Sequence, residues 1–194
     1  EIASCLVGSE MCIRDRGITK ITPADMEYAK ELGMTIKLLA TSRRIGDSFY
    51  AMVAPFLVGQ SSPLYSVNDV FNAVFVLGNV LGDAMFYGSG AGKLPTASAV
   101  VADIMEAVEN ADHNVPLGWS SERLVIADQK TSVHRYFVRV EGTGTELEQA
   151  AAAAFGGAEL VKLDSVNDEF ALLTGEMSDC LLYTSPSPRD KRQS

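Results

Sequence analysis

Residues 72–110 read NAVFVLGNVLGDAMFYGSGAGKLPTASAVVADIMEAVEN. Two apolar runs, 72–77 and 83–88, flank a glycine-containing connection, and this spacing predicts a β-hairpin. The hairpin leads into Gly-Ser-Gly-Ala-Gly at 88–92, and a helix carrying Pro95 near its start is expected from there to about residue 110. The stretch therefore predicts two paired strands, a glycine-rich turn and a helix in direct succession.

The glycine-rich turn is the first candidate site. Glycines let a backbone approach a ligand closely, and a following helix directs unpaired N–H groups at that ligand. The same pattern also arises where glycines serve only as turn residues, so both interpretations stay open from the residues alone. The turn is not a dinucleotide fingerprint, because Lys93 stands where the third glycine of Gly-x-Gly-x-x-Gly is needed.

Upstream of the hairpin, the pattern predicts one helix and two strands. Thr22 is a candidate N-cap, Pro23 fits the first helical position, and Gly33 is a candidate C-cap. Apolar residues at helical spacing, Met26, Ala29 and Leu32, are expected on one face of this helix. A short apolar run at 35–40 predicts a buried strand, and 48–58 predicts a second strand that Pro55 places at a sheet edge.

Downstream of the hairpin, a polar stretch at 111–130 contains Pro116, Gly118 and Trp119 and is typical of a connector. After it the pattern predicts a strand, a glycine loop, a helix and two strands, at 136–140, 142–144, 146–155, 158–163 and 169–174. A β-α-β-β order normally continues with another helix and strand, so this unit is expected to be cut short. The fold class predicted is α+β, with a mixed-sheet domain fragment followed by a partial ferredoxin-like unit.

Composition excludes several classes of function. A chain of 194 residues that is 47% hydrophobic is long and apolar enough to bury a core. A formal net charge of −9 disfavours nucleic acid and anionic membrane surfaces as partners. Because no apolar window approaches the length of a bilayer span, we expect a soluble, cytoplasmic chain.

The two ends are expected not to be native protein sequence. Residues 1–16 and 180–194 can be back-translated into one inverted DNA repeat, which resembles an adaptor used to prepare sequencing libraries. All three cysteines, Cys5, Cys12 and Cys180, lie in these ends, so neither a disulfide framework nor a cysteine metal site is expected. Gly17 and Asp179 then need not be natural termini.

Outside the glycine-rich turn, few residues point to chemistry, and no metal site is predicted. His113 and His134 are expected to be exposed and incidental, because no carboxylate cluster accompanies them. Lys37 lies in an apolar strand, where it should extend its ammonium to solvent or pair with an acid; a catalytic lysine is the alternative. Three serines have no visible base partner, so a hydrolase triad is unsupported: Ser48, Ser98 and Ser132.

Four strings, 17–21, 36–40, 72–76 and 87–101, closely resemble the later half of the catalytic domain of homoserine dehydrogenases. Residues 135–179 resemble the ACT-type regulatory domain of the bacterial enzymes, although 142–147 lacks the usual proline before glycine. The resemblance divides the chain into adaptor-derived ends (1–16 and 180–194), a catalytic-domain part (17–111), a connector (112–134) and a truncated ACT-like domain (135–179).

The resemblance implies reduction of L-aspartate 4-semialdehyde to L-homoserine with NADPH or NADH, on the route to threonine, methionine and isoleucine. It implies that Gly92 contacts the nicotinamide cofactor, with Gly90 and Ala91 shaping the turn. In the family the dinucleotide-binding domain, which holds most of the cofactor, and the catalytic lysine lie upstream of the stretch matching Gly17. Lys37 does not replace that lysine, so no catalytic residue is assigned and the chain alone is predicted to be inactive.

The partners implied are a small-molecule substrate, further copies of the enzyme in a homo-oligomer, and an amino-acid effector at the ACT-like unit. A second class of function stays open: a non-catalytic amino-acid-binding or dimerisation module. It requires no missing chemistry, because hairpins and ACT-type sheets are ordinary oligomer surfaces.

Overall fold

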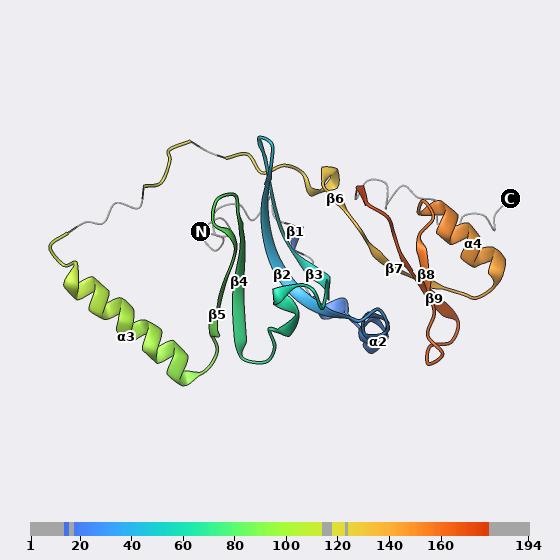
Figure 1. The fold of residues 1–194 in the computed structure, drawn as a ribbon, viewed down its shortest axis with the longest axis horizontal. Coiled ribbons are helices and arrows are strands. Elements are labelled where there is room, and N and C mark those ends of the chain that lie inside the picture. The colour runs from blue at the N-terminus through green and yellow to red at the C-terminus, as the bar shows by residue number, and fades with distance from the viewer. Residues whose placement is uncertain (1–13, 16–17, 114–117, 123, 179–194) are drawn as a thin grey trace. The chain divides into compact units, whose positions relative to one another are not determined.

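The computed structural model describes residues 14–15, 18–113, 118–122 and 124–178 (Figure 1). Helices combine with small, mainly antiparallel sheets, and residues 14–15 add one short parallel pairing, which agrees with the predicted α+β class. The chain forms two compact units, of which the first combines Glu1–Leu57 with Leu124–Ser194 and the second is Val58–Arg123. The boundaries of these compact units differ from those of the domains that the resemblance implies. The domain boundaries therefore stay a prediction.

The second unit contains the predicted hairpin and helix. Its elements are η2 (Pro63–Ser66), β4 (Phe71–Gly78), β5 (Gly82–Ser89) and α3 (Lys93–Glu109). Strands β4 and β5 pair antiparallel over their whole length, with Asn72 opposite Gly88. The rings of Phe71 and Tyr87 stack across the pair at 4.9 Å between centroids. The hairpin, the glycine-rich turn and the helix are therefore confirmed.

The N-terminal part of the other unit contains a well-capped helix, α2. The elements of this part are β1 (Arg14–Asp15), η1 (Ile18–Lys20), α2 (Pro23–Glu31), β2 (Met34–Ile45) and β3 (Ser48–Gly59). The Thr22 side chain accepts from the backbone of Asp25, and the Asp25 carboxylate accepts from the backbone of Thr22, which completes a capping box. Leu32 is the C-cap, and Gly33 follows it with a φ of +66°.

Two of the expectations for this part are wrong. The strand at 35–40 is not a buried one, because no residue of β2 is fully buried and Leu38 is 45% exposed. Strand β3 is not an edge strand, since the sheet order is β1-β3-β2. Strand β1 pairs with β3 only at Met52 and Val53, so Pro55 lies beyond that short pairing and its missing N–H interrupts no bond to β1.

The C-terminal part follows the predicted β-α-β-β order. Its elements are η3 (Gln129–Thr131), β6 (Val133–His134), β7 (Phe137–Glu141), α4 (Thr145–Ala154), β8 (Glu159–Val161), β9 (Glu169–Leu173) and β10 (Met177–Ser178). Strands β7, β9 and β8 form an antiparallel sheet in that order, and β10 pairs antiparallel with β6. Because β6 lies within 112–134, the end of the predicted connector belongs to a sheet.

A helix covers each face of the β7-β9-β8 sheet. Phe170 and Leu172 of β9 pack with Ala151 and Phe155 on the α4 side. Ala171, between them in sequence, points to the opposite face and packs with Tyr28 of α2 and Val161 of β8. The alternation along β9 therefore joins the C-terminal sheet to a helix from the N-terminal part of the chain.

Several expectations lie outside the described residues. The three cysteines, Pro116 and nearly all of the adaptor-derived ends belong to this group. Of those ends only Arg14 and Asp15 are described, and they pair with β3 through backbone bonds, which do not depend on side-chain identity. No helix in the described ranges is long and apolar enough to cross a membrane.

Candidate functional site

The glycine-rich turn joins β5 to α3 and comprises Gly90, Ala91 and Gly92. Gly92 is the N-cap of α3 and has a φ of +113°, a conformation that residues with a Cβ rarely adopt. Gly90 is restricted for a different reason. A Cβ built at Gly90 would collide with the Asn72 amide nitrogen and would lie 3.2 Å from Asn72 Cγ.

The start of α3 offers backbone donors to a ligand. No side chain caps this helix, and its first turn contains no acidic residue. The Thr96 N–H donates to the Gly92 carbonyl at 3.2 Å, and Pro95 has no N–H. The N–H groups of Lys93 and Leu94 therefore have no carbonyl partner within the helix and suit an anionic or carbonyl oxygen of a ligand.

The other sequence-predicted candidates lie apart from this turn. His113 is exposed just after α3, Ser98 is exposed on α3, and Ser48 begins β3 in the other unit. Lys37 is half-buried in β2, and whether it has a catalytic role stays a prediction.

The expectation that Ser132 has no base partner is wrong. Ser132 Oγ lies 2.8 Å from His134 Nε2, and His134 is half-buried rather than exposed. The signal was present in the sequence, because residues i and i+2 of an extended segment share a face. A hydrolase is still unsupported, since Ser132 is only 2% exposed and accepts a hydrogen bond from Arg43 at 3.0 Å.

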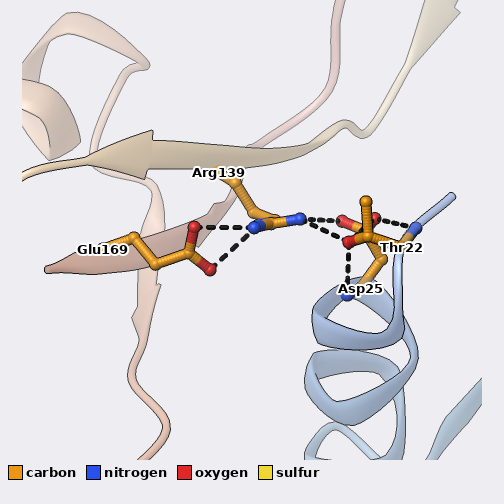
Figure 2. A network of polar contacts seen from close by, with 4 residues as sticks. All are labelled: Thr22, Asp25, Arg139 and Glu169. Atoms are coloured by element: carbon orange, nitrogen blue, oxygen red, sulfur yellow. Dashed lines mark hydrogen bonds and ion pairs between the residues drawn. The ribbon is translucent and has the colours of Figure 1, made fainter. Parts of the chain in front are cut away.

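The most extensive polar network in the described chain centres on Arg139 of β7 (Figure 2). Arg139 binds Glu169 through two bonds of 3.0 and 2.6 Å, and its Nη1 donates to Asp25 at 3.0 Å and to Thr22 at 2.8 Å. Sequence reasoning missed this network, because 114 residues separate Arg139 from Asp25. The guanidinium thus joins the capping box of α2 to the C-terminal sheet.

The network changes the acidity of its members. Burial alone would raise the pKa of Asp25, but hydrogen bonds from Thr22 and Arg139 outweigh it and hold that pKa below its usual value. The hydrogen bond to Glu169 is the main cause that raises the pKa of Arg139. Every group is engaged with another protein group, so we interpret the network as structural.

The fold and the turn define a general class: an α+β protein in which a glycine-rich turn between a strand and a helix leaves backbone N–H groups without a partner in that helix. Similarity to known proteins identifies the family within this class. The profile of the homoserine dehydrogenase family matches residues 3–105, a range that begins inside the predicted adaptor sequence. The chain belongs to the homoserine dehydrogenase family.

Individual relatives agree with this assignment. The homoserine dehydrogenase of Neisseria gonorrhoeae is 37% identical over 160 residues, which cover 77% of this chain and 36% of the relative. The Bacillus subtilis enzyme is 41% identical over 98 residues, covering 50% of this chain and 23% of the relative. The chain thus spans 36% and 23% of the lengths of these two curated relatives.

Solved structures show the same fold. The crystal structure of a homoserine dehydrogenase from Thiobacillus denitrificans superposes with a TM-score of 0.74 at 27% identity, covering 93% of this chain and 44% of that one. A homoserine dehydrogenase from S. aureus superposes with a TM-score of 0.61 at 28% identity, covering 91% and 43%.

Proposed function

We propose that this chain is part of an NAD(P)-dependent homoserine dehydrogenase, which reduces L-aspartate 4-semialdehyde to L-homoserine. The observation that carries the proposal is the turn Gly90-Ala91-Gly92, placed between β5 and α3 within the range that matches the family. Its role is to form one wall of the site where the nicotinamide ring meets the substrate.

The turn fits a nicotinamide cofactor in two respects. At Gly92 the backbone has a left-handed φ and no Cβ, so the chain can approach a flat ring closely there, while the glycine at position 90 leaves room for the Asn72 side chain beside the turn. The N–H groups of Lys93 and Leu94 provide donors for a polar group of the cofactor. When bound, NAD(P)H supplies the hydride. The turn Gly90-Ala91-Gly92 holds and orients the nicotinamide ring of the cofactor.

We assign no catalytic side chain to this chain. The resemblance puts the catalytic lysine and most of the cofactor contacts in sequence upstream of the stretch matching Gly17. The purified 194-residue chain should therefore show no homoserine-dependent reduction of NADP. Measurable activity of the purified chain would contradict this part of the proposal.

We further propose that residues 135–179 are the beginning of an ACT-like regulatory unit that binds an amino-acid effector. The strand order β7-β9-β8 with α4 on one face supports this, because it matches the first four elements of a ferredoxin-like unit. The family resemblance also supports a cytoplasmic homo-oligomer.

The cofactor role can be tested with two glycine variants in the full reading frame that contains residues 17–179. Gly92→Ala forces a left-handed φ on alanine, so it should raise the KM for NADP at least about tenfold. Gly88→Ala is the matched control, because nothing lies within 4 Å of a Cβ there and the backbone is not left-handed. Equal KM values for both variants would contradict the proposed role of Gly92.

A further inference from the structure

The first compact unit contains a pocket of about 470 Å³ that the proposed cofactor role does not use. Two neighbouring strands of one sheet, β2 and β3, form its apolar wall through Met34, Ile36, Met52 and the run 54–57. The segment leading from β6 into β7 forms the other wall and contributes His134 and Arg135. Among the described residues that line the pocket there is no aspartate or glutamate.

Arg135 is held in place by a buried residue. Its Nε donates to the Thr174 carbonyl at 3.1 Å, and Thr174 is fully buried. Thr174 is itself fixed, because its hydroxyl donates to the Gly175 carbonyl and accepts from the Tyr136 N–H. No other described residue bonds to the Arg135 side chain, so the edge of the guanidinium that carries Nη1 and Nη2 is left for a ligand.

His134 is held by a second buried residue. Ser132, which is 2% exposed, lies 2.8 Å from His134 Nε2 and also accepts a hydrogen bond from Arg43. Ser132 and Thr174 are the two buried polar residues among the core positions of the described chain. Burying a polar group is costly unless it is hydrogen-bonded, yet both such residues lie behind the polar wall of one pocket. The wall therefore has a supported, fixed geometry.

We propose that this pocket binds a small carboxylic acid that has a branched apolar body and no ammonium group. A guanidinium edge binds a carboxylate through two parallel hydrogen bonds, and Arg135 presents such an edge. The apolar wall accepts a branched aliphatic body, and the volume lies in the usual range of small-molecule sites. An ammonium group would enter without an acidic partner, so the pocket discriminates against amino acids.

Three matched compounds test the ligand class by isothermal titration calorimetry on the 194-residue chain. The 2-oxo acid 4-methyl-2-oxopentanoate should bind saturably. L-Leucine, which carries an ammonium group in place of the oxo group, should bind at least about tenfold more weakly. The ketone 4-methyl-2-pentanone, which lacks the carboxylate, should be weaker by a similar factor. Absence of saturable oxo-acid binding, or equal binding of leucine or the ketone, would overturn the proposal.

Variants and chemical shifts locate the site. Arg135→Gln should weaken oxo-acid binding at least about tenfold, and Arg135→Lys, which keeps the charge but not the two-pronged geometry, should fall in between. Arg44→Gln is the control, because Arg44 is exposed and pairs with Asp47 at 3.6 Å on the surface.

A second measurement covers the case in which Arg135→Gln fails to fold. On titration of the unaltered chain, backbone amide shifts should change most at residues 34–36 and 134–137. Changes centred on other residues would overturn the assignment even if the affinity is as expected. Because the glycine turn is not involved, this result is independent of the proposed dehydrogenase role.

Discussion

Arg139 Nη1 lies 3.0 Å from Asp25 Oδ1, so a charged bond fastens the first turn of α2 to strand β7 (Figure 2). The same guanidinium binds Glu169 on the neighbouring strand β9. Tyr28, one turn further along α2, packs against Phe137 of the same sheet with ring centroids 5.7 Å apart. The polar bond and the apolar contact act together, so the N-terminal helix and the C-terminal sheet should unfold as one unit.

Replacing Arg139 should destabilise this unit strongly. Arg139→Gln leaves Asp25 and Glu169, whose side chains are 14% and 12% exposed, without their cation. We expect a loss of about 1–3 kcal/mol in the free energy of unfolding, measured by urea denaturation with circular dichroism. Arg44→Gln removes a solvent-exposed pair instead and should change stability by less than about 0.5 kcal/mol. Equal losses in the two variants would contradict a structural role for the Arg139 network.

The Arg139 network also makes stability depend on pH, through the lowered pKa of Asp25. The folded-state pKa of Asp25 lies below its usual value of 3.8, so its ionised form favours the folded state. This contribution is complete above the unfolded-state pKa and is lost as the pH falls through the folded-state pKa. The stability difference between the unaltered chain and Asp25→Asn should therefore be large at pH 7 and shrink towards pH 3. Urea midpoints at both pH values measure it, and a constant difference would contradict the prediction.

Whether a feature of the fold could be predicted from the sequence depended on how far apart in the chain its interacting residues lie. The hairpin, the N-cap at Thr22 and the β-α-β-β order follow local periodicity and local hydrogen bonds, so they could be predicted. The central position of β3 and the partners of Arg139 depend on segments distant in sequence, which no local pattern specifies. The contact of Ser132 with His134 is intermediate, because the i, i+2 spacing was visible in the sequence but the backbone conformation of residues 132–134 was not.

The hydroxyl of Tyr28 is buried and has no hydrogen-bond partner among the described residues. Burial also raises the pKa of this phenol, so it stays protonated and neutral. Because an unpaired buried hydroxyl opposes folding, Tyr28→Phe should leave the free energy of unfolding unchanged or raise it by up to about 1 kcal/mol. Tyr50→Phe is the matched control, since Tyr50 Oη lies 3.3 Å from Thr131 Oγ1 and loses that bond. A loss of stability in Tyr28→Phe that exceeds the control would contradict this prediction.

Gly90 and Asn72 should show a compensating pair of substitutions. Gly90→Ala places a Cβ against the Asn72 side chain, whereas the backbone at Gly90 is not left-handed, so the collision is the main penalty. In the full reading frame, Gly90→Ala should raise the KM for NADP at least about tenfold by displacing the turn. Adding Asn72→Gly removes the obstructing amide and should restore most of the affinity, while Asn72→Gly alone should have a small effect. A double variant as impaired as Gly90→Ala would show that Gly90 is required for contact with the cofactor itself rather than for clearance from Asn72.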